Sequence, residues 1–368
     1  MELILFCRRG AGLSLIVFSL AGMMAGQTGR AKTSPDVPKL SEQVFKNIQI
    51  LKGTPSEQLI PAMQFISSSL GVECSFCHVE GALEKDDKKP KQTARKMMQM
   101  MAVINQANFD GKRKVTCYSC HHGSTHPANI PLIAEQETPP PDSVVPQVDQ
   151  ILARYVDAVG GSSAIAKLTT RVAKGHVTLV GKQFPIEIFS KAPGKQLSVI
   201  HLPNGDTVTA YDGVSGWSII PNRPLRYIST AEAASARLEA DLQLPIHLKQ
   251  LFSEINTEKP EKIGEREVYV ISAFNAGELA AKFYFDEHSG VLVRMLRYVN
   301  SPLGLNPTQI DYSDYRQQGG VKMPFQQTIL RFRTRLAIQI DEAHTNVPLN
   351  DAKFVPPSAP AADSQIPQ

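Results

Sequence analysis

Two pentapeptides of one pattern, residues 74–78 (CSFCH) and residues 117–121 (CYSCH), constrain this 368-residue chain more than any other feature. Cys-x-x-Cys-His is the attachment pattern of c-type haem. The two thiols of a motif can form thioethers with both vinyl groups of one porphyrin, and the adjoining histidine then becomes the proximal ligand of the iron. We therefore predict two covalently attached haem c groups. The residues that hold them are Cys74, Cys77 and His78 for the first haem, and Cys117, Cys120 and His121 for the second.

A zinc site with four thiolate ligands is the alternative use of these cysteines. Such sites usually leave about 15 to 20 residues between their two cysteine pairs, whereas residues 78–116 separate the pairs in this chain. Zinc also gives no reason for a histidine after both pairs. A thioredoxin-like dithiol would need a β-α-β setting, which this helical region does not offer. Haem attachment is therefore the favoured interpretation.

Residues 1–27 have the composition of an export segment. Arg8 and Arg9 precede an uncharged apolar run at residues 11–26, which is shorter than the roughly 20 residues of a spanning helix. A cleaved signal peptide and an uncleaved N-terminal anchor both fit. Because bacteria attach haem c outside the cytoplasm, we predict an exported, periplasmic protein, either free or attached to the periplasmic face of the inner membrane. Any membrane association would be through the N-terminus or a partner.

The rest of the chain divides by composition. Residues 28–128 are predicted to form the dihaem cytochrome c domain, 129–147 a proline-rich linker, 148–357 a β-rich domain and 358–368 a disordered tail. The β-rich part alternates with period two and includes a long predicted strand at residues 326–340. The predicted fold class is multidomain α+β: a mainly α-helical dihaem domain followed by a largely antiparallel sheet with a few helices.

Two helices are predicted in the haem segment. A capping box at residues 54–57 opens the first, which runs toward Leu70 and has Gly71 as its C-cap. Pro61 inside it should kink or restart the helix. The second is predicted at about residues 93–107, with an apolar face formed by Met97, Met100, Met101 and Ile104.

Each iron needs a sixth ligand or an open site for catalysis. Methionine opposite histidine raises the reduction potential and closes the site, as in an electron carrier. Five of the ten methionines lie on the helices that lead into the motifs, at positions 63, 97, 98, 100 and 101. Such methionines also fill gaps in hydrophobic cores, so spacing alone leaves the ligand within the second group open. His122 and His126 are alternatives, but both follow the second motif too closely to reach around the porphyrin easily.

The haem segment resembles the cytochrome c subunit of photosynthetic reaction centres. The resemblance rests on residues 41–47 (SEQVFKN), 72–78 (VECSFCH), 94–97 (ARKM), 104–105 (IN) and 115–121 (VTCYSCH). In that family each of these haems takes its methionine from the helix before its own motif. The resemblance therefore implies Met63 as the iron ligand of the first haem and Met97 as that of the second.

The chain also departs from that family. Its photosynthetic members often carry four haems, whereas this chain has two motifs, and the extra histidine ligand expected within residues 105–114 does not occur. The second half has no counterpart in the four-haem subunit. Its pattern loosely resembles the curved-sheet lipoprotein-carrier proteins.

The predicted function is one-electron transfer by a carrier, not an enzyme. The partners would be a redox protein as donor and a membrane-bound acceptor, which the resemblance implies is the photo-oxidised primary donor in the reaction centre core. A respiratory or other extracytoplasmic chain is the alternative setting, and a dihaem peroxidase, which needs one open iron site, is the alternative activity. A third hypothesis is that the β-rich domain binds an apolar ligand or partner.

Charge adds one prediction and one exclusion. A formal net charge of +4, without a basic patch interleaved with aromatic residues, gives no reason to expect nucleic acid as a partner. Cations cluster in sequence around the haem motifs, either as a solvated surface or as a docking face for an acidic redox partner. They are the lysines and arginines at positions 85, 88, 89, 91, 95, 96, 112, 113 and 114.

Overall fold

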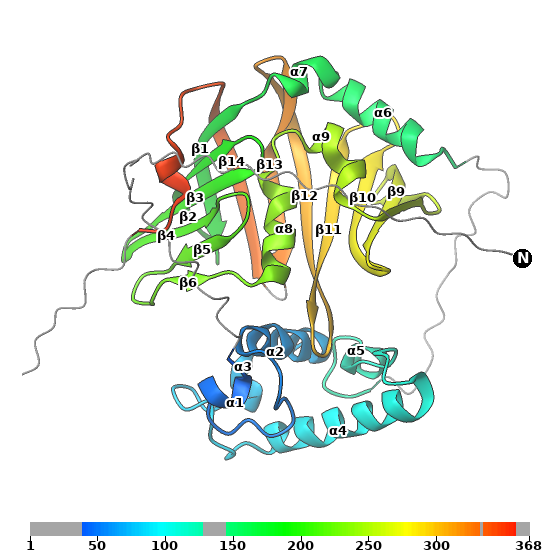
Figure 1. Cartoon of the computed structure of the whole chain (residues 1–368), viewed down its shortest axis with the longest axis vertical. Coiled ribbons are helices and arrows are strands. Elements are labelled where there is room, and N and C mark those ends of the chain that lie inside the picture. Colours follow the sequence, from blue (N-terminus) through cyan, green and yellow to red (C-terminus); the bar gives the residue numbers. More distant parts are fainter. Residues whose placement is uncertain (1–38, 128–144, 332–333, 358–368) are drawn as a thin grey trace, which may run out of the picture. The chain divides into compact units, whose positions relative to one another are not determined.

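The computed structural model describes residues 39–127, 145–331 and 334–357 (Figure 1). The predicted export segment, most of the predicted linker and the predicted tail lie outside these residues. From Lys39 onward the chain forms one compact unit. Helices come first in it and a large antiparallel sheet with a few helices follows, which confirms the predicted fold class. The domain boundaries inside the unit stay predictions.

The helices of residues 39–127 are α1 (Ser41–Val44), α2 (Ser56–Leu70), α3 (Cys74–Cys77), α4 (Lys89–Phe109) and α5 (Cys117–His121). Helix α2 has Pro55 at its N-cap and no side-chain cap hydrogen bond, so the predicted capping box is wrong. Its predicted C-cap is confirmed, because Gly71 has the left-handed φ of 68°. Pro61 lies inside one continuous helix, which does not restart there. No described helix is both long and apolar enough to span a membrane.

Helix α4 differs from its prediction in start and in register. It begins four residues early, with a proline in its first turn, where a missing N–H leaves no hydrogen bond unmade. Its buried residues are Lys91, Met98 and Asn105, whereas Met97 and Met100 are 40% and 49% exposed. The predicted apolar face is therefore wrong at Met97 and Met100. Two hydrogen-bonded polar side chains take part of the buried stripe instead.

The described strands form one 14-stranded sheet in the order β6-β5-β4-β3-β2-β1-β14-β13-β12-β11-β10-β9-β7, with β8 paired to β9. Their bounds are β1 Thr170–Leu179, β2 Lys182–Lys191, β3 Lys195–Leu202, β4 Gly205–Tyr211, β5 Gly216–Ile219, β6 Arg226–Tyr227, β7 Glu254–Thr257, β8 Glu261–Ile263, β9 Arg266–Asn275, β10 Glu278–Asp286, β11 Leu292–Ser301, β12 Gly304–Gln318, β13 Val321–Arg331 and β14 Thr334–Thr345.

Two antiparallel meanders join through β1 and β14, whose residues are far apart in the chain. Val177 on β1 lies opposite Ile338 on β14. The single strand predicted at residues 326–340 is wrong, because β13 ends at Arg331 and β14 begins at Thr334 as its antiparallel partner. Period-two alternation continues from β13 into β14, so the pattern alone does not separate the two strands.

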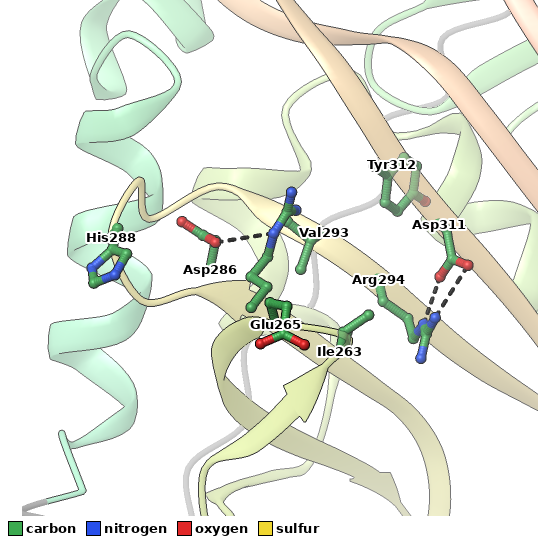
Figure 2. Close-up of a pocket in the computed structure, with 9 residues that line it drawn as sticks. Ile263, Glu265, Asp286, His288, Val293, Arg294, Asp311 and Tyr312 are labelled. Carbon is green, nitrogen blue, oxygen red and sulfur yellow. Dashed lines mark hydrogen bonds and ion pairs between the residues drawn. The ribbon is translucent and has the colours of Figure 1, made fainter.

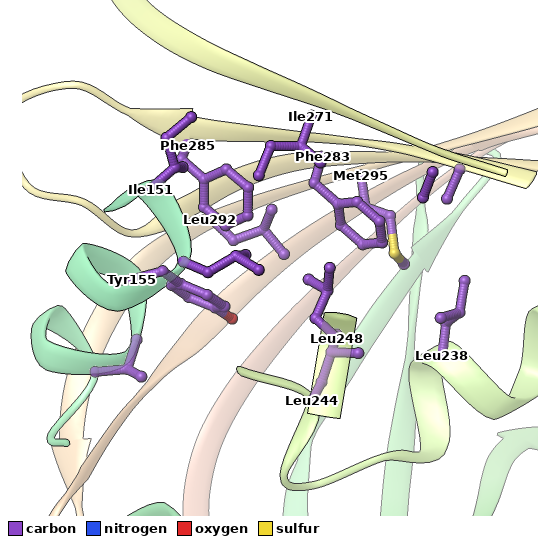
Figure 3. Packing of buried hydrophobic residues seen from close by; sticks show 14 of the residues in the cluster. Ile151, Tyr155, Leu238, Leu244, Leu248, Ile271, Phe283, Phe285, Leu292 and Met295 are labelled. Atoms are coloured by element: carbon purple, nitrogen blue, oxygen red, sulfur yellow. The ribbon is translucent and has the colours of Figure 1, made fainter. Parts of the chain in front are cut away.

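Helices cover one face of strands β9 to β12 (Figure 3). They are α6 (Val148–Ala158), α7 (Ser162–Ala166), α8 (Thr230–Ala240) and α9 (Leu244–His247), followed by the 3₁₀ turn η1 (Leu248–Leu251). Phe283 and Phe285 are fully buried beneath them, and burial of each such ring contributes roughly 1.5–3 kcal/mol. On β9, Val270 packs in a separate cluster from Ile271, as expected for neighbours on opposite faces.

The sheet curves around α8. This helix contacts β3 and β4 on one side and β11 on the other, although β2, β1, β14, β13 and β12 lie between them in the sheet. The Gln196 side chain on β3 donates to the carbonyl of Glu239 at 3.1 Å. The Glu239 carboxylate forms an ion pair with Arg297 on β11 at 2.6 Å. A flat sheet could not bring both β3 and β11 into contact with the C-terminal turn of α8.

The core of the haem segment is small and is completed by the β11–β12 hairpin. Leu303 in the turn of that hairpin packs on α2 beside Phe65 and is 4% exposed. A Cβ atom at Gly304 would lie 2.4 Å from the Phe65 ring, so glycine allows this approach. Asn306 donates to the carbonyl of Pro61 at 2.9 Å. The hairpin therefore supports the helix that carries Met63.

Candidate haem-binding site

The cysteines of both motifs lie on single helical turns. Cys74 and Cys77 are three apart on α3, and Cys117 and Cys120 are three apart on α5, so each pair lies on one side of its turn. All four are free thiols; Cys74 and Cys120 are exposed and the other two are half-buried. Burial raises the pKa of the Cys77 and Cys117 thiols. Each motif thus presents two unpaired thiols on one face.

The two motif histidines are oriented in the same way. Nδ1 of His78 lies 2.8 Å from the carbonyl oxygen of Leu83, and Nδ1 of His121 lies 2.9 Å from that of Ser124. A carbonyl oxygen only accepts hydrogen bonds, so Nδ1 carries the proton in both rings. The lone pair on Nε2 is then available to a metal, and the ring orientation is set by a backbone group.

The two motifs are brought together by glycines. The amide of Gly123, just after the second motif, donates to the carbonyl of Ser69 at the end of α2 at 2.9 Å. A Cβ atom at Gly71, just before the first motif, would lie 2.1 Å from the Gly123 carbonyl oxygen. Gly71 also has a left-handed φ, which disfavours side chains. The chain therefore needs glycine where the two attachment motifs approach each other.

Asn105 fixes the methionine helix α4 to the second motif. Its side chain is 5% exposed. The amide group donates to the carbonyl of Val115 at 2.7 Å, and its oxygen accepts from the backbone amides of Lys114 and Val115 at 3.0 and 2.9 Å. In the sequence Asn105 stands out only as part of the family resemblance, and these three hydrogen bonds show its structural role.

Packing separates the methionines into two groups. Met98 is 8% exposed in the core of the haem segment, and Met63 and Met101 pack against that core. Met97 and Met100 have largely accessible side chains. Met98 is therefore a packing residue. Iron ligation by Met63 and Met97 stays a prediction.

One ring nitrogen of His122 is engaged by its own turn. It has a left-handed φ of 48°, and its Nε2 lies 3.1 Å from the carbonyl oxygen of Ser119. Its ring lies 5.5 Å from that of Tyr118. Because Nε2 donates in this arrangement, only Nδ1 keeps a free lone pair.

Exposed apolar side chains concentrate around the motifs. Of the 14 large hydrophobic residues exposed in the described ranges, nine lie in residues 39–127, which are under a third of those ranges. They are Val44, Ile60, Phe76, Leu83, Met97, Met100, Val103, Phe109 and Tyr118. Such a surface is typical of a binding site. Paired thiols, oriented imidazoles and apolar surroundings together fit covalently attached porphyrins.

The predicted cationic face needs correction at two residues. Lys91 is 8% exposed, and the Arg95 side chain is 14% exposed and pairs with Asp86 at 2.8 Å. Both are internal and cannot dock a partner. The exposed lysines of the group are those at positions 85, 89, 96, 112 and 114.

A hollow of about 570 Å³ lies on the β-rich part (Figure 2). Two of its three carboxylates are paired with arginines, and Glu265 is the third: Asp286 lies 3.3 Å from Arg266, and Asp311 lies 2.5 Å from Arg294. Such mutual neutralisation leaves these two aspartates with little capacity to act as a general base. The described residues also contain no group of three or more His, Cys, Asp or Glu side chains placed to hold a metal ion.

A second cavity, of about 680 Å³, lies where the sheet curves around α8 and α9. Aliphatic side chains form about half of its lining, and charged side chains line it as well, including Arg171, Asp241 and the ion pairs Arg297–Glu239 and Arg226–Glu232. Nε of Arg171 is buried and has no hydrogen-bond partner within the described ranges. Burial lowers the pKa of Arg171 to about 10. The guanidinium therefore remains charged at neutral pH in a mostly apolar space.

Comparison with known proteins supports the resemblance of the haem segment. Residues 23–162 match the family described as photosynthetic reaction centre cytochrome C subunit. The photosynthetic reaction center cytochrome c subunit of Roseobacter denitrificans is 29% identical over 139 residues, 33% of this chain and 37% of that protein. That of Thermochromatium tepidum is 34% identical over 99 residues, 24% of this chain and 23% of the relative. Cytochrome c-554 of Chloroflexus aurantiacus is 32% identical over 85 residues, 21% and 20% of the two chains. The predicted resemblance is confirmed, and the chain spans 20–37% of the length of these relatives.

The predicted likeness of the second half to lipoprotein carriers is also found. A putative outer membrane lipoprotein-sorting protein domain from Vibrio parahaemolyticus aligns with a TM-score of 0.40 and 11% identity, over 56% of this chain and 94% of that one. The LolA superfamily protein NE2245 from Nitrosomonas europaea aligns with a TM-score of 0.39 and 12% identity, over 58% and 99%. Likeness at this level carries no conclusion about ligands or partners.

Proposed function

We propose that this protein is a dihaem c-type cytochrome that carries single electrons on the periplasmic side of the membrane. The observation that carries the proposal is the pair of Cys-x-x-Cys-His motifs, each with its histidine Nδ1 held by a backbone carbonyl. Met63 and Met97 would close the two iron sites opposite His78 and His121. Closed sites favour a carrier over a peroxidase, which needs one open iron site.

The residues of the chain would anchor, orient and insulate the cofactor. The four thiols would anchor two haems, the carbonyl-bound imidazoles of His78 and His121 would each offer Nε2 to an iron, and apolar side chains such as Phe76 and Tyr118 would exclude water. When bound, haem supplies a one-electron couple between ferric and ferrous iron. One electron leaves a reduced donor and the same electron reaches an oxidised acceptor, with no bond made or broken.

The acceptor is proposed to be the photo-oxidised primary donor of a reaction centre. This rests on the relatives that are named as reaction centre subunits. A respiratory or other extracytoplasmic chain is the alternative. The exposed lysines of the haem segment would steer an acidic partner, so the rate of electron transfer should fall as salt rises.

A redox titration of the purified full-length protein with visible spectra tests the proposal. We expect two low-spin haems that titrate as two one-electron steps, and no peroxidase activity from the reduced protein. Haem content of one or none would contradict the dihaem proposal. Rapid peroxide turnover would contradict the carrier role.

A second candidate function concerns the cavity of the β-rich part. Arg171 forms no ion pair with a carboxylate among the described residues, and its Nε is buried without a hydrogen-bond partner, which is costly for a charged group. We propose that the cavity binds an apolar molecule with an anionic group, which would pair with Arg171. The cavity volume of about 680 Å³ is within the range of small-molecule sites.

Arg171→Gln should weaken this binding selectively. Palmitate and the neutral palmityl alcohol are suitable probes, because they differ mainly in charge. Loss of a charge-assisted pair should weaken palmitate binding by about tenfold or more, measured by displacement of a fluorescent probe, and leave the alcohol unaffected. Arg335→Gln, at an exposed arginine of β14, is the matched control. Equal palmitate affinity in Arg171→Gln and wild type would refute the anionic site.

A further inference from the structure

The loop that follows the first haem motif is built around a buried ammonium group. Lys91, on the first turns of α4, is 8% exposed. Its Nζ donates to the carbonyl oxygens of Leu83, Glu84 and Lys85 at 2.9, 2.9 and 2.7 Å. Lysine is almost never buried unless it is paired. Lys91 satisfies its charge with three backbone carbonyls and one carboxylate, all from one short loop.

That carboxylate is Asp86, which lies 3.0 Å from Lys91 Nζ. Arg95 on the next turns of α4 pairs with Asp86 at 2.8 Å, and Asn47 donates to it at 3.0 Å. These hydrogen bonds, that of Arg95 first, hold the pKa of Asp86 well below its usual range. The loop is thus tied to α4 by two cations and one ionised carboxylate, and the position of the ammonium is fixed.

Lys91 and His78 share one acceptor. The carbonyl oxygen of Leu83 accepts from Nδ1 of His78 at 2.8 Å and from Nζ of Lys91 at 2.9 Å. A carbonyl oxygen has two lone pairs, so both bonds can form together. Among the described residues, the equivalent acceptor at the second motif, the carbonyl of Ser124, receives no bond from a cation. The two proximal histidines therefore have unequal surroundings.

We propose that Lys91 is a positioning residue that raises the reduction potential of the first haem relative to the second. An ammonium on the Leu83 carbonyl withdraws electron density from it and makes it a weaker acceptor for His78. The imidazole is then a weaker electron donor to its metal. A fixed positive charge nearby also favours the ferrous state, which carries one positive charge less than the ferric state. Both effects have the same sign.

This inference rests on the proposed dihaem function and predicts where electrons reside. An electron shared between the two haems would favour the first haem, because its couple has the higher potential. The approach of the motifs at Gly71 and Gly123 gives the two haems a short path for this exchange. Lys91 belongs by sequence to the predicted cationic cluster, and its burial gives it this different role.

The test is a spectroelectrochemical titration of the full-length holoprotein with Lys91→Gln, which keeps two donor protons and removes the charge. The first haem is identified as the one whose midpoint reduction potential also shifts in Met63→Leu. In Lys91→Gln we expect the equilibrium constant for reduction of the first haem to fall by about tenfold. For one electron this lowers its midpoint potential by about 59 mV. The second midpoint should stay, and the methionine–iron charge-transfer bands should persist, since no iron ligand is lost.

Three further variants separate the effect of charge from effects on folding. Lys91→Arg keeps the positive charge and should restore most of the potential. Lys52→Met removes an exposed lysine of the same segment and should leave both midpoints unchanged. If Lys91→Gln does not accumulate as folded protein, Lys91→Met, which keeps the apolar stem, serves for the same comparison.

The outcomes distinguish this inference from the function on which it rests. A wild-type protein without covalent haem would overturn both. A wild type with two haems whose midpoints are the same in Lys91→Gln would overturn the role of Lys91 alone. Equal shifts of both midpoints would also overturn it, because the Leu83 carbonyl contacts only the first motif histidine.

Discussion

Met97→Leu is expected to remove the sixth ligand of the second haem and to lower its reduction potential. Thioether ligation stabilises the ferrous state. Its loss should lower one midpoint by on the order of 0.1 V, within the roughly 0.8 V range that axial ligands cover. The methionine–iron charge-transfer band should lose about half of its intensity, because the first haem keeps Met63. Redox titration with visible spectra measures both effects.

Met100→Leu is the matched control. Met100 lies one turn further along α4 and is exposed to a similar degree, 49% against 40% for Met97. Packing therefore leaves both thioethers accessible, and only the family resemblance selects Met97. We expect Met100→Leu to keep both midpoints and the full band. An intact band in Met97→Leu, with loss in Met100→Leu, would transfer the ligand role to Met100.

Replacing Cys117 and Cys120 together by alanine is expected to halve the covalent haem content. These two thiols are the only predicted anchors of the second haem, and among the described cysteines neither forms a disulfide. His121 could still hold a porphyrin without a thioether bond, so the measurement needs denaturing conditions. Intact mass and the haemochrome spectrum after denaturation should both report one haem in place of two. The midpoint that Met97→Leu moves should be absent from the titration.

Cys7→Ser is the control for that experiment. Cys7 is the one cysteine outside the two motifs, and we expect its replacement to leave two haems per chain. Two covalent haems in the Cys117 and Cys120 double variant would rule out α5 as an attachment site. Loss of both haems would show that the two sites assemble together, in line with the Gly71–Gly123 approach.

Sequence periodicity predicted helix α4 but not its buried face. The methionines at 97, 100 and 101 suggested an apolar stripe, whereas Lys91 and Asn105 occupy part of the true one. A periodicity argument treats lysine and asparagine as solvent-facing. Both are buried here because backbone groups from outside the helix satisfy them: three carbonyls of one loop for Lys91 and the chain before the second motif for Asn105.

The sheet shows the same division between local and distant information. Most strands of the β-rich part follow from alternation over a few residues. The pairing of β1 with β14 joins residues more than 150 positions apart, and no local pattern contains it. The surroundings of Arg171 are also non-local, because they come from strands on both sides of the β1–β14 pairing and from α8.

The sequence by itself determined the chemistry of attachment, because the two thiols and the histidine of a haem c site are contiguous in the chain. It also indicated the fold class and the family resemblance of the first third. Only the tertiary structure decided which cations are internal, which methionines pack the core, how the two motifs approach and that Lys91 shares a carbonyl with His78. All four properties depend on contacts between segments that are distant in the sequence. Burial changes the role of a side chain although its neighbours in the sequence stay the same.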